Sequence, residues 1–390
     1  MKRVEPHEAA IRATFTSSAR SVFRKLFAEG PATRPQLCAA LDLSRPTMSS
    51  SIGELERVGY VEKIGEIQGA LGRKAGMYRL GAGAGHVIAV DAGSTHVRLR
   101  VSTLDRRLLH HRVYRLASNQ RYLGPEISQA VAEEIEAVRA ETEKGWGKLR
   151  ALGIALPSRV VEDDTEKAAT RQENLFSHFK PPADVPLLLE NNVNCAAIAE
   201  QSHGVARGHK DFAYIQVGVK IGMGVVLGGR LIRGRSGAAG EISHLPYPWG
   251  PGQKPENGAL EDHVGAEALM QRVRAAWPGA RGPAPADTAA LFALAGQGDE
   301  DALSQVRRHA EDIGAIVSAC VGVIDPGLFV LGGGIGSNPL MLPTVRETVQ
   351  RLSYPTDIES SLLGHDATVL GIEKIAADHA CEMLVGTVTD

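Results

Sequence analysis

The stretch HVIAVDAGSTHVRLRVSTLDRRLLHHRVYRL, residues 86–116, decides the fold of the larger part of this chain. It begins with a short apolar run that ends at Asp91, and a glycine turn at residues 93–95 follows at once. Two further segments then alternate apolar and polar residues with the period of two that strands show. The stretch therefore predicts three consecutive strands, with a carboxylate and a tight turn at the end of the first.

Strand-loop units of the same kind recur along the rest of the chain, and helical patterns at residues 127–139 and 306–320 lie between them. One early set and one mid-chain set of such units predict an α/β body with two similar lobes around a cleft. The later units are ALGIALPS (151–158), LLLENNVNCAAIAE (187–200), FAYIQVGVKIGMGVVLGGRLIRG (212–234) and GLFVLGGGIGSN (327–338).

Length and composition describe a soluble protein with more than one domain. A chain of 390 residues is too long for one compact core, so two or three domains are expected. No apolar run approaches the roughly 20 residues of a membrane helix, and the first residues lack the apolar segment of a secretory signal. Cys38, Cys195, Cys320 and Cys381 lie far apart without C-x-x-C spacing. This spacing disfavours disulfides and a cysteine-built zinc site, and favours a reducing cytoplasm.

Charge is distributed unevenly along the chain. Residues 1–80 contain 13 Lys and Arg against 8 Asp and Glu, a net charge of +5. The remaining 310 residues contain 30 against 37, a net charge of −7. A basic head on an acidic body suggests that only the head meets a polyanion, although a surplus of this size also arises by chance.

The basic head has the pattern of three short helices and a hairpin. Residues 17–30 place apolar side chains on one helical face and stop at Gly30. Thr33 and Ser44 are the expected N-caps of two more helices, the second with a buried stripe that runs from Met48 to Val58. Two strands around a glycine-rich tip follow. This order is typical of a winged helix-turn-helix, so residues 1–81 are predicted to bind a double-stranded DNA operator.

The third helix carries the residue types that read a major groove. Small hydroxyl side chains allow close approach, and an arginine reaches a guanine edge or a phosphate. Basic side chains at the hairpin tip suit phosphate or minor-groove contact. The alternative is a small helical domain that docks protein through a solvated, serine-rich face. The predicted DNA-binding residues are Arg34, Ser44, Arg45, Thr47, Ser49, Ser50, Arg73 and Lys74.

Four motifs of the body resemble, in order, those of the ROK family of repressors, open reading frames and kinases: DAGSTHVR (91–98), ENNVNCAAIAE (190–200), GAAGEISH (237–244) and VLGGGIGSN (330–338). The resemblance implies a two-lobed, actin-like (ribonuclease H-like) ATPase or sugar-kinase fold behind the winged helix-turn-helix. Lobe 1 would comprise residues 82–191 and 366–390, and lobe 2 residues 192–365. The DNA-binding head makes the chain similar to the regulator branch, which includes xylose and N-acetylglucosamine repressors.

Kinase chemistry is disfavoured at the positions to which the resemblance assigns it. The kinases of the family read E-N-D, with the aspartate as general base, where this chain has Asn192. An amide does not take a proton at neutral pH, and loss of a general base typically costs about 10²–10⁴-fold in rate. In the two phosphate loops Ser94, Val219, Lys220 and Met223 also depart from the family pattern. No catalytic residue is therefore expected; Lys220 either binds an anion or is simply solvated.

The sugar side of the cleft matches the family better. Neutral amides beside carboxylates suit a polyol, because each buried hydroxyl needs both a donor and an acceptor. The alternative is that Asn174, Asn191 and Glu241 cap strand ends and satisfy the backbone. The predicted ligand-binding residues are Gly153, Asn174, Asn191, Asn192, Glu241, His244 and Glu261.

A structural zinc site, common in the family, is not expected. There the counterpart of His244 is followed by three cysteines, which complete a tetrahedral site. The interval LPYPWGPGQKPENGALED of this chain contains no cysteine, and Ala259 stands at the last ligand position. The sequence therefore predicts neither a metal nor a cofactor.

Together these features predict a cytoplasmic, DNA-binding transcriptional regulator of sugar-metabolism genes, most simply a repressor. Its body would sense a sugar or sugar phosphate without phosphorylating it, and a homodimer or homotetramer would bind the operator. Two rivals stay open: an active sugar kinase with a fused DNA-binding head, and a DNA-binding scaffold with a vestigial cleft.

Overall fold

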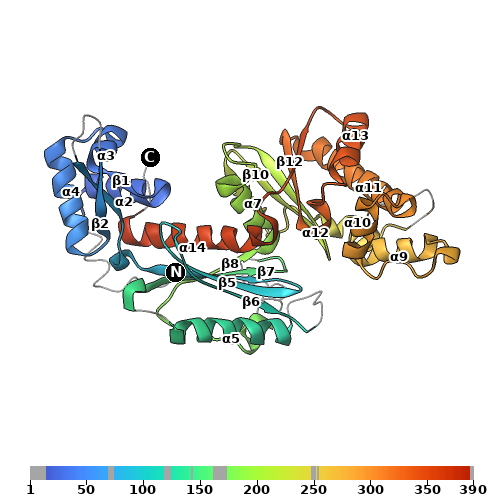
Figure 1. The fold of residues 1–390 in the computed structure, drawn as a ribbon, viewed down its shortest axis with the longest axis horizontal. Coiled ribbons are helices and arrows are strands. Elements are labelled where there is room, and N and C mark those ends of the chain that lie inside the picture. Colours follow the sequence, from blue (N-terminus) through green and yellow to red (C-terminus); the bar gives the residue numbers. More distant parts are fainter. Residues whose placement is uncertain are drawn as a thin grey trace.

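The protein is described by a computed structural model that covers residues 15–68, 74–117, 124–141, 144–160, 174–246, 252 and 254–386. These residues form a small N-terminal head and two five-stranded sheets with their helices. Figure 1 shows the head at one end, the second sheet at the other, and the long helix α14 (Ala367–Val385) between them.

The helices of the head begin and end where their capping residues predict. Gly30 adopts a φ of 82° just after the first helix, a conformation that favours glycine. Thr33 and Gln36 form a reciprocal capping box, and the hydroxyl of Ser44 accepts from the backbone N–H of Thr47. The elements of the head are α2 (Ser17–Glu29), β1 (Ala32–Thr33), α3 (Arg34–Leu41), α4 (Arg45–Arg57), β2 (Val61–Gln68) and β3 (Lys74–Leu80).

Apolar side chains from all of these helices meet in one core, which includes Phe23, Leu37 and Ile52. Val58, expected in the same stripe, is only half-buried, because α4 ends at Arg57 and Val58 forms its C-cap. β2 and β3 pair as an antiparallel hairpin, and β1 pairs with the other edge of β3. The tip of this hairpin, residues 69–73, lies outside the described residues.

The two large sheets have the same topology. The first has the order β6-β5-β4-β7-β8, and the second the order β11-β10-β9-β12-β13. In each, the first three strands along the chain pair antiparallel and the last two add in parallel. The expected pair of similar lobes is thereby confirmed. The strands are β4 (His86–Ala92), β5 (His96–Thr103), β6 (Leu108–Arg115), β7 (Leu149–Leu156), β8 (Leu187–Asn191), β9 (Phe212–Val217), β10 (Ile221–Leu227), β11 (Arg230–Ile232), β12 (Leu328–Gly332) and β13 (Asp357–Ser360).

Helices cover the faces of these sheets. The two predicted helical patterns at residues 127–139 and 306–320 fall inside α5 and α11, and the helix predicted after Asn191 is α7. α5 packs on the first sheet, whereas α11 and α13 pack on the second. The bounds are α5 (Pro125–Glu141), α7 (Asn192–His203), α8 (Ala259–Val264), α9 (Ala266–Ala276), α10 (Thr288–Gly296), α11 (Glu300–Ile324), α12 (Gly333–Gly336) and α13 (Leu342–Leu352).

The head and the first sheet share a single hydrophobic core. Phe23 and Leu26 of α2 belong to the same buried cluster as Leu104 beyond β5 and Leu384 of α14. At about 25 cal/mol per Å² of buried apolar surface, such a shared core resists separation of the two parts. The limits predicted for the domains, 1–81, 82–191 with 366–390, and 192–365, stay predictions.

The four cysteines are all free thiols, three of them buried. None of the described helices is both long enough and apolar enough to cross a membrane.

Candidate functional site

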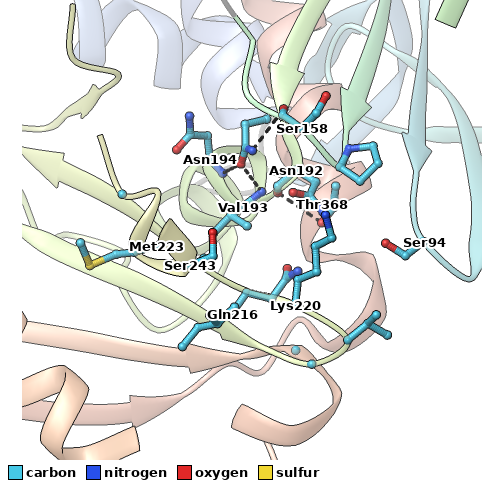
Figure 2. A pocket seen from close by; sticks show the side chains of 18 of the residues that line it. Ser94, Ser158, Asn192, Val193, Asn194, Gln216, Lys220, Met223, Ser243 and Thr368 are labelled. Carbon is cyan, nitrogen blue, oxygen red and sulfur yellow. Dashed lines mark hydrogen bonds between the residues drawn. The ribbon is translucent and has the colours of Figure 1, made fainter. Parts of the chain in front are cut away.

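A cleft of about 1270 Å³ lies between the two sheets. Ends of strands from both sheets line it, together with the first residues of α7 and α14. Ligands of open α/β sheets bind at this edge because the strands end there and leave polar groups unpaired. Figure 2 shows the side chains of Ser94, Ser158, Asn192, Asn194, Gln216, Lys220, Met223, Ser243 and Thr368 around the cleft.

Asn191 is the N-cap of α7 as well as a lining residue. Its Oδ1 accepts hydrogen bonds from the backbone N–H groups of Val193 at 2.8 Å and Asn194 at 3.2 Å. Its Nδ2 donates to the carbonyl oxygen of Ser158 at 3.3 Å. The amide is therefore largely occupied by backbone partners, which agrees with the alternative of a strand-end cap.

Glu190 orients the side-chain amide of Asn194, in the first turn of α7. This carboxylate is buried, and its Oε1 accepts from the Nδ2 of Asn194 at 3.0 Å. Because the Nδ2 of Asn194 is held in this way, its carbonyl oxygen is left to accept a hydrogen bond from a ligand in the cleft. Asn194 thus offers the acceptor that the occupied amide of Asn191 lacks.

Asn192, which the family resemblance predicts at the general-base position, lines the cleft. The hydroxyl of Thr368 donates to its backbone carbonyl at 3.4 Å and so connects the starts of α14 and α7. The side chain of Asn192 can donate and accept hydrogen bonds but has no basic group for proton abstraction.

Asp91, at the end of β4, is a buried carboxylate on the same cleft. Burial raises its pKa to about 7, while Arg98, 3.6 Å away, lowers it. The carboxyl is therefore partly protonated near neutral pH and can act there as a donor or as an acceptor.

The opposite wall holds a second polar group. The Nδ1 of His244 lies 3.1 Å from the Oδ1 of Asn257, and its Nε2 lies 3.8 Å from the Oε2 of Glu241. Glu261, from α8, lines the cleft nearby. These residues bring a carboxylate pair and an imidazole to one side of the cleft, where they suit hydroxyl groups of a ligand.

The residues around His244 do not fit a zinc ion. Its two ring nitrogens face an amide and a carboxylate, and Ala259 supplies no ligand atom. Across the described part of the chain, no group of three or more His, Cys, Asp or Glu side chains is arranged to hold a metal ion.

The cleft brings Asn191, Asn192, Glu241, His244 and Glu261 together, as the sequence predicts. Gly153 is a different case, because it does not line the cleft and is buried inside β7. A Cβ atom there would lie 2.8 Å from the Cγ1 of Ile372, so glycine at this position permits close packing of α14 on the sheet. The side chain of Asn174 lies outside the described residues.

Several lining residues were missed at the sequence level. Asn194 had a local signal, since it lies one helical turn after Asn191. Ser158, Gln216 and Thr368 had none, because each comes from a different element and only the fold brings them together. Lys220, at the β9–β10 turn, points into the cleft (Figure 2).

On the head, the outer face of α4 is exposed. Ser44 and Thr47 are partly engaged, since their hydroxyls lie 2.8 Å apart at the start of the helix. Arg34 is half-buried and stacks over the ring of Tyr78 with 4.9 Å to the centroid, so its first role is packing. Arg73 lies outside the described residues. The exposed residues of the predicted set are Ser44, Arg45, Thr47, Ser49, Ser50 and Lys74.

Comparison of the sequence finds similar curated proteins that include xylose repressors and glucokinases. The xylose repressor of Bacillus subtilis (strain 168) is 24% identical over 377 residues, which cover 93% of this chain and 95% of the repressor. A glucokinase of Streptomyces coelicolor is 24% identical over 324 residues, which cover 75% of this chain and 98% of the kinase. Because the match to the repressor covers 93% of this chain, it includes most of the head.

Solved structures share the fold. A ROK family transcriptional regulator, described as a homolog of the E. coli MLC protein, superposes with a TM-score of 0.71 at 18% identity and covers 97% of this chain and 98% of that one. A ROK family glucokinase from Streptomyces griseus, in complex with glucose and AMPPNP, has a TM-score of 0.61 at 24% identity over 75% of this chain and 100% of that one. Residues 87–379 match the model of the ROK family. The body of the molecule thus has the fold and the sequence pattern of that family, and the chain belongs to the ROK family.

Proposed function

We propose that this chain is a cytoplasmic transcriptional regulator, a repressor of sugar-metabolism genes, whose ROK body binds a sugar or sugar phosphate without phosphorylating it. The observation that carries the proposal is the pairing of two features in one molecule. Arg45 and its neighbouring hydroxyls are exposed on α4 of the head, and the amide of Asn192 lines the cleft, at the position to which the family resemblance assigns the base of the kinases.

The lining of the cleft supports a polyol ligand. Asn192, Asn194, Gln216 and Ser243 offer neutral donors and acceptors, and Glu241 offers a carboxylate. A ring hydroxyl needs both kinds of partner once it leaves water, whereas an apolar ligand would leave these groups unsatisfied. The relatives point the same way, since their names refer to xylose and to glucose.

The form of the head supports double-stranded DNA as the partner. Three helices with an N-capped third helix, followed by a hairpin, have the element order of a winged helix-turn-helix, in which α4 would enter the major groove. Such modules usually read two half-sites, so we propose a homodimer or homotetramer on the operator.

A sugar kinase with a fused head is the second candidate, because glucokinases are among the relatives. It requires a base near the ligand hydroxyl and room for the nucleotide phosphates. Asn192 does not supply the base, and Lys220 projects into the cleft from the turn that corresponds to the second phosphate loop.

Two measurements on the purified full chain test the proposal. Thermal unfolding with a panel of sugars and sugar phosphates should reveal a stabilising ligand, because a ligand at 100 times its Kd stabilises by about 2.7 kcal/mol. ATP hydrolysis with the same ligands should stay at background. Sugar-dependent ATP hydrolysis would support the kinase instead. If no compound of the panel raises the Tm, the chain is a DNA-binding scaffold that binds no sugar.

A further inference from the structure

Two long helices run from the cleft toward the head. The first turn of α7 and the first turn of α14 both line the cleft, through Asn194 and Thr368 respectively. The helices approach each other closely near the cleft, since a Cβ on Gly371 would lie 1.8 Å from the carbonyl oxygen of Cys195. At 1.5 Å per residue, 12 residues of α7 span about 18 Å, so the far end of the helix is distant from any ligand.

At its other end, α14 belongs to the core of the head. Ala380 and Leu384 lie in the same buried cluster as Phe23 of α2, and Arg24 donates to the carbonyl oxygen of Gly386 at 2.8 Å. Figure 1 shows this C-terminal end of α14 beside the head. The C-terminal end of α14 is thus packed into the head, whereas α7 packs against α14 nearer the cleft.

The β5–β6 turn reaches the same place from the first sheet. Arg106 in this turn has a φ of 64°, a left-handed conformation that is uncommon for a residue other than glycine. The turn is cross-braced, because Arg106 N donates to the carbonyl of Thr103 at 2.9 Å and Arg107 Nε contacts Asp105. Arg107 also donates to the carbonyl of Leu80, at the end of the head. These hydrogen bonds hold the backbone of the turn in one conformation, and with it the positions from which its two arginine side chains extend.

Arg106 bridges α7 and the head. Its Nη1 lies 3.4 Å from the Nε2 of His203, the last residue of α7, and its Nη2 donates to the carbonyl of Ala28 at 3.3 Å. Ala28 is in the last turn of α2, where carbonyl groups lack helical partners and favour a cation. Burial, together with Arg106 and other nearby cations, lowers the pKa of His203. The imidazole is therefore neutral at pH 7, and its Nε2 can accept from Arg106.

From α2 the contacts continue to the predicted recognition helix. The carboxylate of Glu54, in α4, accepts from the backbone N–H and the hydroxyl of Thr16, each at 3.1 Å. The hydroxyl of Ser51 donates to that of Ser18 at 2.9 Å. A displacement of α2 would thus move α4 with it.

We propose that Arg106 couples the cleft to the head, as a positioning residue that joins the end of α7 to the end of α2. Ligand contacts at Asn192 and Asn194 shift α7 as a rigid body, so that His203 moves relative to Arg106. The hydrogen bond from Arg106 to the carbonyl of Ala28 changes as a result. The inference rests on the proposed function, because it requires a ligand in the cleft and DNA on α4. It explains how a cleft at one end of α7 acts on a helix that no ligand touches.

Hydrogen exchange of the full chain, with and without sugar, tests the coupling. The probe is whichever of D-xylose, D-glucose and glucose 6-phosphate raises the Tm of the wild-type protein most. Two variants interrupt the bridge: Arg106→Asn, which tolerates the left-handed backbone but is too short to reach both partners, and His203→Ala, which removes only the side of α7. Arg107→Ala is the matched control, because it removes a guanidinium contact to the head that does not involve α7.

In the wild type and in Arg107→Ala, the sugar should slow exchange at residues 191–194 and also change it at residues 24–29. In both bridge variants the first effect should persist and the second should be lost. Affinity for a duplex selected from a random pool by the wild-type protein should then change less than twofold on addition of sugar. Persistence of the α2 response in Arg106→Asn and His203→Ala would overturn the coupling.

The coupling and the proposed function fail in different ways. A wild-type protein whose residues 191–194 respond to sugar while residues 24–29 do not still binds a sugar, but Arg106 is not the link. A protein in which residues 191–194 respond neither to these three compounds nor to any other member of the sugar and sugar-phosphate panel contradicts the proposed sensing, and the coupling with it. Should Arg106→Asn not fold, His203→Ala decides alone, since its substitution leaves the β5–β6 turn intact.

Discussion

Arg233 places both Nε, at 2.7 Å, and Nη2, at 2.6 Å, against a single carboxylate oxygen of Glu190. Glu190 lies in β8, the edge strand of the first sheet, and Arg233 directly follows β11, the edge strand of the second. The other oxygen of Glu190 accepts from the Nδ2 of Asn194. One buried carboxylate therefore joins the two lobes and orients an amide of the cleft.

Replacement of Glu190 by Gln should lower stability and weaken ligand binding together. The neutral amide loses the charge-assisted bonds to Arg233, although Arg233 is 45% exposed and water can take over part of its solvation. We expect a loss of about 1–3 kcal/mol in the free energy of unfolding, measured by urea denaturation. Arg346→Ala is the control, since it breaks an exposed ion pair with Glu359 and should cost less than about 1 kcal/mol. Equal losses in the two variants would contradict the role of Glu190.

Asp91 should make stability depend on pH. Its pKa, about 7 in the folded protein, lies above the ordinary value of 3.8, so the folded state binds the proton more tightly than the unfolded chain. The resulting contribution to stability is complete below about pH 4 and is lost as pH rises to about 7, at about 1.4 kcal/mol per unit of pKa shift. Asp91→Asn should therefore gain stability over the wild type across this pH range and keep a constant advantage above it. Denaturation from pH 4 to 9, with the exposed Asp184→Asn as control, measures the difference; a flat difference would contradict the raised pKa.

Gly153→Ala should impair packing, not ligand contact. The added methyl group would lie 2.8 Å from Ile372 Cγ1 and 3.0 Å from its carbonyl oxygen, so α14 must move. Overpacking of this kind costs about 1–3 kcal/mol and lowers the Tm. Gly322→Ala, with no atom within 4 Å of the new Cβ, should instead stabilise α11 by up to about 1 kcal/mol. If the Gly153→Ala protein is fully stable but no longer binds ligand, Gly153 acts in ligand binding and not only in packing.

Arg45→Ala should weaken DNA binding while the ligand response persists. A guanidinium contact to a base or a phosphate is worth about 1–3 kcal/mol, and its loss should also reduce the salt dependence of binding. The measurement is the Kd for the selected duplex at several salt concentrations. Arg57→Ala, at the far end of α4 and also exposed, is the control. An unchanged affinity in Arg45→Ala would show that α4 does not face the DNA.

Glu241→Ala and His244→Ala should abolish the ligand response and leave basal DNA affinity unchanged. Both residues line the cleft, in the segment that follows β11 of the second sheet. Each substitution removes a polar partner of a ligand hydroxyl, so the sugar-induced rise in Tm should fall by most of its value. Retention of the full rise in both variants would mean that the ligand binds elsewhere.

The sequence by itself determined the elements and most of their order. Gly30, Thr33 and Ser44 delimit the helices of the head because capping depends on bonds within a few residues. The repeated strand-turn units indicated two similar lobes for the same local reason. Asn191 and Asn192 were found in the cleft because a strand that runs into a helix puts its end at the edge of a sheet.

Only the tertiary structure decided which of these groups are available to a ligand. Asn191 is occupied by its own helix, whereas Asn194 is turned by a carboxylate that also binds an arginine 43 residues later. Gly153 packs against a helix more than 200 residues away, and Thr368 reaches Asn192 across 176 residues. Hydrogen bonds and van der Waals contacts act over a few ångströms in space, whatever the separation along the chain. Local patterns therefore specify caps and strands, and the packing of distant elements specifies the site.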